Sequence, residues 1–109
     1  MQSRIDALLL LMDKGQDSAM LRFSLGNEYF AAGEHAEAVK QFRAALELDR
    51  NYSAAWKLLG KTLADTGDAS GAIAAYEEGI AVATGKGDRQ AAKEMNVFLK
   101  RLLQQTRST

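Results

Sequence analysis

Apolar residues recur at helical spacing along the chain, in paired runs that short polar breaks separate. The first run starts at Leu21, just after Asp17-Ser18, a pair typical of helix N-termini. Polar residues around Gly33 end this run, and a second run starts at Ala38. Apolar spacing of three and four residues indicates amphipathic helices, and a connection this short makes consecutive helices antiparallel. The pattern predicts a helix, a turn and a second helix.

The same arrangement returns 34 residues later. Identical residues at this interval are few, and all occupy small, apolar or turn positions: Leu25-Gly26 with Leu59-Gly60, Gly33 with Gly67, and Ala38 with Ala72. A helical bundle without repeats has no reason to place glycines at a fixed interval. An internal repeat is therefore favoured.

The repeat divides the chain into four segments of a single domain, residues 1–109. We expect repeats over 19–52 and 53–86, each with two helices. Residues 1–15 match half a repeat, whereas 88–106 have lost the Leu-Gly pair and are predicted to form a capping helix. Flanking helices are needed because two repeats alone would leave both ends of the stack exposed to water.

This pattern resembles the tetratricopeptide repeat, a helix-turn-helix unit of 34 residues. The second unit matches the family pattern at Trp56, Leu59-Gly60, Gly67, Ala72 and Tyr76. The first unit matches it at Leu25-Gly26, Tyr29, Gly33, Ala38, Phe42 and Ala45. The departures are Arg22 for Trp, Leu63 for Tyr, Gly79 for Ala, and Arg50 and Thr84 for Pro. The resemblance implies an all-α fold, a short right-handed α-solenoid of about six helices.

Composition argues against catalysis and against metal binding. The chain has no Cys and one His, which excludes disulfides, thiolate chemistry and His-based metal sites, so we expect no metal and no cofactor. His35 falls in a predicted turn as an exposed residue, and Glu77-Glu78 point in different directions on a helix. We expect no enzyme activity.

Charge and hydropathy argue against nucleic-acid binding by the whole chain, against membrane association and against secretion. Basic and acidic residues number 14 each, so no net field attracts nucleic acid or a membrane surface. The apolar run from Ala7 to Met12 is too short for a signal peptide, and no run approaches the roughly 20 residues of a membrane span. We expect a soluble, cytoplasmic protein.

The resemblance implies a protein-binding scaffold or adaptor whose first helices line a concave groove for a peptide or a partner's helix. Transferred to this sequence, the groove residues are Met20, Phe23, Asn27, Phe30, Ala54, Lys57, Lys61 and Asp65, with Ala91, Met95 and Phe98 from the last helix. We expect an apolar anchor of the peptide against Phe23 and Phe30. A carboxylate of the peptide is expected near Lys57 and Lys61.

An alternative role is open for the three phenylalanines. Partial burial against neighbouring helices accounts for Phe23, Phe30 and Phe98 equally well. Some family members clamp a C-terminal carboxylate with Lys and Asn from three repeats. That clamp is not expected, because Phe23 replaces its first Lys, and Ala91 and Met95 replace its last basic residues, although Asn27 matches.

Two other functions stay open. The run Leu8–Met12 is apolar all round and leaves Leu10 or Leu11 without an internal partner, which favours a homodimer through the N-terminal helix. From Arg89 onward the chain has five basic residues and one acidic residue, Glu94. Nucleic-acid binding there is a minor alternative, since the helix dipole also favours such charges and no aromatic residue is interleaved to stack on bases.

Overall fold

The computed structural model of the protein describes residues 3–107, and all regular structure in that range is helical. The six helices are α1 (Ser3–Asp13), α2 (Ala19–Ala31), α3 (His35–Leu48), α4 (Ser53–Asp65), α5 (Ala69–Gly85) and α6 (Arg89–Arg107). The predicted all-α fold of about six helices is confirmed. Residues 1 and 2 of the expected N-terminal segment lie outside the described residues.

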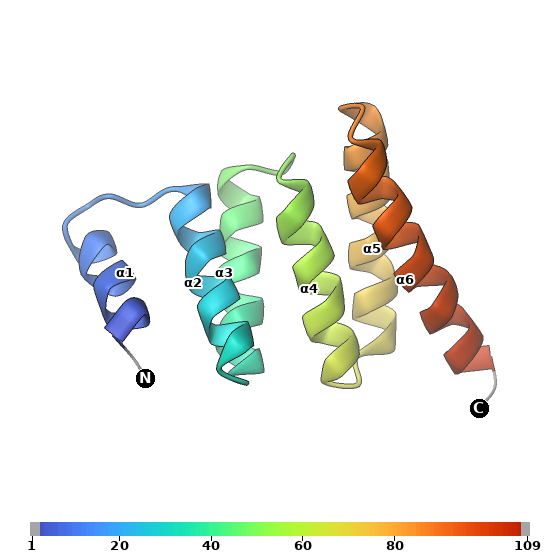
Figure 1. Cartoon of the computed structure of the whole chain (residues 1–109), viewed down its shortest axis with the longest axis horizontal. Coiled ribbons are helices and arrows are strands. Elements are labelled where there is room, and N and C mark those ends of the chain that lie inside the picture. Colours follow the sequence, from blue (N-terminus) through green and yellow to red (C-terminus); the bar gives the residue numbers. More distant parts are fainter. Residues whose placement is uncertain (1–2, 108–109) are drawn as a thin grey trace.

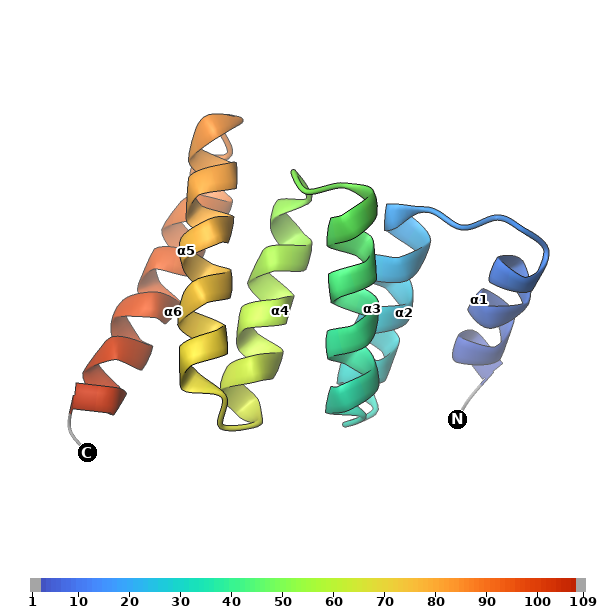
Figure 2. The same cartoon turned by 180° about the vertical axis from the view of Figure 1, so that it is seen from behind.

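The helices form two layers along a stack of 45 × 31 × 18 Å. Figure 1 looks onto the layer of α2, α4 and α6, with α3 and α5 behind it. Seen from behind, α4 is visible between α3 and α5 (Figure 2). Among the described helices, α1 contacts α2 alone, so it covers one end of the stack. The arrangement is a helical repeat solenoid.

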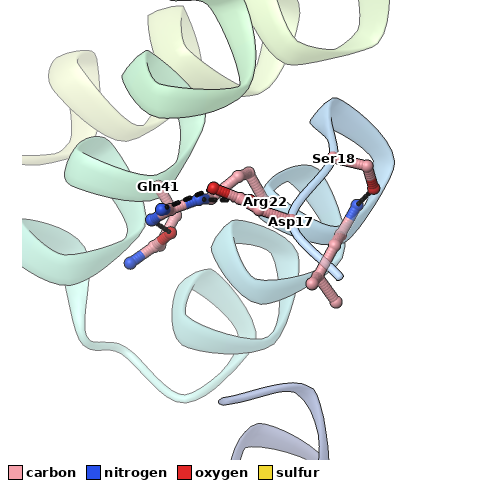
Figure 3. A network of polar contacts seen from close by, with 5 residues as sticks. Asp17, Ser18, Arg22 and Gln41 are labelled. Atoms are coloured by element: carbon pink, nitrogen blue, oxygen red, sulfur yellow. Dashed lines mark hydrogen bonds and ion pairs between the residues drawn. The ribbon is translucent and has the colours of Figure 1, made fainter. Parts of the chain in front are cut away.

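Polar contacts fix the start of α2 and join it to α3 (Figure 3). Ser18 is the N-cap of α2, and its Oγ accepts a hydrogen bond from the Leu21 backbone N at 3.1 Å. Arg22 donates to both oxygens of Asp17, at 2.9 and 3.0 Å, and to Oε1 of the buried Gln41 of α3, at 3.1 Å. The hydrogen bonds from Arg22 lower the pKa of the Asp17 carboxyl. Arg22 therefore links α2 to α3 at a position where the family has Trp.

The core depends on glycines that lie under aromatic rings. Phe42 of α3 is fully buried against Gly26 of α2, where an added methyl group would lie 2.6 Å from two ring carbons. Tyr76 of α5 covers Gly60 of α4 with an equally close approach. Without a side chain on either glycine, the two helices of each pair come close enough to exclude water from both rings.

Replacing Gly26 by Ala tests this packing. In a helix interior alanine is more favourable than glycine by up to about 1 kcal/mol. The overlap of the added methyl group with the Phe42 ring costs about 1–3 kcal/mol. We expect Gly26→Ala to lower the free energy of unfolding measured with urea. The control is Gly85→Ala at the end of α5, where an added methyl group meets nothing within 4 Å, and stability should be kept or increased. A Gly26→Ala protein at least as stable as the unmodified chain contradicts the packing.

Candidate functional site

The residues predicted to line a groove lie on α2, α4 and α6, the helices of one layer. Met20 is 70% exposed, and Asn27 and Asp65 are also exposed. Phe23, Phe30, Lys57 and Lys61 are half-buried and keep part of their surface accessible. We call this surface the α2–α4–α6 face.

Met95 is not part of that surface, so its assignment to the groove was wrong. Its side chain is fully buried against α5, and its sulfur occupies the space that a side chain at Gly79 would need. Leu102, two turns further along α6, is buried on the same side of the helix. Packing against α5 therefore determines which face of α6 is turned inward. The small residue at 79 was the available signal that a large side chain enters there.

Aromatic side chains fill the α2 end of the face. The ring of Phe23 stacks on Tyr52 with centroids 4.9 Å apart and also contacts the buried Phe42, at 5.8 Å. Tyr52 precedes α4 and was missed by the sequence analysis, although an aromatic residue in a connector between repeats was a usable signal. Burial raises the pKa of the Tyr52 hydroxyl. Phe23 is thus both packed against its neighbours and partly accessible.

Phe30 lies near the other end of α2. It meets the ring of His35 edge to face, with centroids 6.1 Å apart. The expectation of His35 as an exposed turn residue was wrong, because it is half-buried and is the first residue of α3. Its ring supports Phe30 from the other layer.

The two lysines of α4 have different surroundings. The Lys57 ammonium donates to Oε1 of Glu94 on α6 at 2.8 Å, and Gln90 donates to the other carboxylate oxygen at 3.0 Å. These contacts hold the pKa of Glu94 below its ordinary value. The Lys61 ammonium instead lies over two rings, 6.0 Å from the centroid of Phe30 and 5.5 Å from that of Phe98. Within residues 3–107, Lys61 forms no ion pair.

A hollow of about 300 Å³ lies beside Lys61, between α4 and α6. Its lining residues are Lys61, Ala64, Asp65, Tyr76, Phe98, Arg101, Leu102 and Gln105. Tyr76 has little exposed surface, and its ring lies 6.0 Å from that of Phe98. Burial raises the pKa of Tyr76 to about 12, with the Asp65 carboxylate adding to the effect. Arg101 was not predicted, although it follows Phe98 by one helical turn.

Two further surfaces bear on the alternative functions. Leu10 and Leu11 of α1 are 54% and 37% exposed. On α6, Lys100 and Arg107 line a shallow hollow with Leu103 and Gln104, and no aromatic residue lines it. Nucleic-acid contact through α6 therefore stays a minor alternative.

Residues 3–107 contain no group of three or more His, Asp or Glu side chains placed to hold a metal ion. No helix among α1 to α6 has the length and apolar character that crossing a membrane requires.

The Lys57–Glu94 ion pair predicts a pH dependence. Because the pKa of Glu94 is lowered on folding, the pair stabilises the fold above the ordinary pKa of glutamate, about 4.3, and this contribution is lost as the pH falls through the lowered value. We expect the pKa of Glu94, followed by carboxyl carbon NMR, to rise in Lys57→Gln. It should stay low in the control Lys93→Gln, because Lys93 forms no ion pair within residues 3–107. Equal Glu94 titrations in both variants contradict the assignment.

Comparisons with known proteins agree with this architecture. The family model for the TPR repeat matches residues 26–67. A TPR repeat-containing protein of Pseudomonas aeruginosa is 47% identical over 98 residues, which cover 90% of this chain and 93% of that protein. The heat-shock protein cognate co-chaperone sgt12 of Aspergillus fumigatus is 38% identical over 77 residues, 71% of this chain but only 22% of the co-chaperone.

Solved structures are similar over most of the chain. A Bordetella parapertussis protein superposes with a TM-score of 0.85 at 44% identity, covering 96% of this chain and 91% of that one. A tetratricopeptide repeat domain protein of Salinibacter ruber has the same fold, with a TM-score of 0.74 at 23% identity over 79% of this chain and 87% of its own. The P. aeruginosa relative, which matches nearly the whole chain, and the TPR repeat model show that this chain belongs to the tetratricopeptide repeat (TPR) family.

Proposed function

We propose that the chain binds a peptide or a helix of a partner protein on the α2–α4–α6 face, as a cytoplasmic scaffold or adaptor. TPR proteins are generally interaction modules without catalytic activity, which supports the class of function. In this proposal residues 19–52 and 53–86 act as the two repeats, with 1–15 and 88–106 covering their ends.

One observation supports the choice of this face. Partly exposed aromatic rings and a cation without an acidic partner lie side by side on it, since Lys61 is within 6.0 Å of the ring centroids of both Phe30 and Phe98. Apolar side chains of a ligand can pack on the rings, and an acidic group can bind the cation. The expected ligand therefore has an apolar anchor against Phe23 and Phe30 and a carboxylate near Lys57 and Lys61. Met20, Asn27 and Asp65 would contact the rest of the peptide.

Charge reversal of the lysine pair gives a test that can overturn this proposal. A partner captured on the immobilised chain is purified, and its affinity is measured by calorimetry. Because charge reversal turns attraction into repulsion, Lys57→Glu with Lys61→Glu should weaken binding by roughly tenfold or more. The control pair Lys40→Glu with Arg43→Glu makes the same charge change on exposed residues of α3, in the other layer.

Circular dichroism of each variant establishes that it is folded. The control pair should bind like the unmodified chain. Equal affinity of the lysine double variant and the unmodified chain overturns the proposal for this face.

A second candidate function is self-association through α1. Leu10 and Leu11 expose apolar surface there, and α1 contacts only α2 among the described helices. Its Arg4 forms an ion pair with Glu28 of α2 at 3.3 Å, a contact that does not involve the two leucines. An exposed apolar helix face of this kind fits a two-fold contact with a second copy.

Sedimentation across the micromolar range tests the homodimer. We expect the sedimentation coefficient to rise with concentration towards that of a dimer. The double variant Leu10→Glu with Leu11→Glu should abolish this rise, because a carboxylate buried in the contact would have to be desolvated. A protein that sediments as a monomer at every concentration contradicts the homodimer.

A further inference from the structure

We propose that the hollow between α4 and α6 binds the side-chain carboxylate of an acidic residue in the partner peptide, with Lys61 and Arg101 as its cationic ligands. This inference rests on the proposed function of the α2–α4–α6 face. It places the acidic group one helical turn further along α4 than Lys57, and it adds a residue of α6 that the sequence analysis did not assign.

The distribution of ion pairs selects this position. Lys57 is already neutralised by Glu94 at 2.8 Å, so a ligand carboxylate there would have to displace an existing partner. Lys61 and Arg101 line the same hollow of about 300 Å³, and neither forms an ion pair within the described residues. Lys61 and Arg101 repel each other across the hollow, the single Asp65 carboxylate offsets this only in part, and a bound anion attracts both cations.

The aromatic rings fix where the ammonium of Lys61 lies. It lies over Phe30 and Phe98, on α2 and α6, at 6.0 and 5.5 Å from the ring centroids. Cation–π contact at these distances holds the ammonium without using its hydrogen-bond donors on a carboxylate. Those donors remain available to a ligand, and less side-chain freedom is lost when the ligand binds.

Asp65 limits the charge that the hollow accepts. Its carboxylate lines the same hollow, so the three ionised groups there sum to a single positive charge. One carboxylate matches this charge, whereas a phosphate dianion or a pair of neighbouring carboxylates would meet repulsion from Asp65. A single Asp or Glu side chain is the favoured occupant.

The spacing of the rings and the cation also predicts which kind of side chain lies near the acidic residue in the peptide. In an extended peptide, residues i and i+2 point to the same side and lie about 6.5–7 Å apart. The distances from the Lys61 ammonium to the two ring centroids are similar, at 6.0 and 5.5 Å. An apolar side chain packed on Phe30 or Phe98 would therefore lie two residues away from the acidic side chain in the hollow.

The test uses the peptide acetyl-Gly-Ser-Leu-Ser-Glu-Ser-Gly-amide, titrated to millimolar concentration into the ¹⁵N-labelled full chain. Amide shifts should change around Lys61 and Arg101 and saturate. Loss of one charge-assisted contact at a partly exposed site should weaken binding by about fivefold in Arg101→Gln and in Lys61→Gln. The matched control Lys100→Gln removes an exposed cation next to Arg101 in sequence but outside this hollow, and should bind like the unmodified chain.

Two altered peptides identify the source of the carboxylate. Replacing Glu by Gln in the amidated peptide should weaken binding as much as Arg101→Gln does, and restoring a free C-terminus to the Gln peptide should not recover it. Recovery would assign the hollow to a C-terminal carboxylate and overturn the inference. Absence of saturable shifts on α4 and α6, or equal affinities for Arg101→Gln and Lys100→Gln, would also overturn it.

The outcomes separate this inference from the function on which it rests. If the Gln peptide binds the α2–α4–α6 face as tightly as the Glu peptide, the face remains the binding surface and only the carboxylate site fails. If the shifts are confined to α3 and α5, the proposed function fails as well.

Discussion

An aromatic ring packed on a glycine of the neighbouring helix sets the geometry of both helix pairs. Phe42 occupies the space over Gly26, and Tyr76 occupies the space over Gly60. Because each ring fills the volume that a side chain on the glycine would need, the helices of a pair are held at one close separation. The equivalent contacts in both units place α2 and α4 in one layer and α3 and α5 in the other. The surface offered to a partner is a consequence of this constraint.

The same packing connects the core to the candidate site. Tyr76 covers Gly60 with its ring and also lines the hollow between α4 and α6, next to Phe98. The position of α6 is fixed from two sides, by the burial of Met95 against α5 and by the Lys57–Glu94 ion pair to α4. With Lys57 engaged in that pair, Lys61 is the α4 cation left for a ligand. Structural and binding roles are therefore divided between two lysines one turn apart.

The sequence was sufficient for the fold because a 34-residue period of small, large and turn residues is visible in one chain. The cap at Ser18 was also predictable, since capping is local. The errors concern side-chain contacts between helices, which the spacing within one helix does not determine. Met95 was assigned to the groove from the repeat period alone, but its sulfur fills the space over Gly79, and this contact turns that side of α6 inward. Likewise, neither the engagement of Lys57 by Glu94 nor the convergence of Arg101 on Lys61 follows from the spacing within one helix.

The central claim is that the layer of α2, α4 and α6 is the surface on which a partner binds. Amide hydrogen exchange of the full chain, with and without its purified partner, measures this directly. Binding should slow exchange in α2, α4 and α6, with the largest effect on the turns that contain Phe30, Lys61 and Phe98, and leave α3 and α5 unchanged. Slowed exchange confined to α3 and α5, or to α1, would contradict the account.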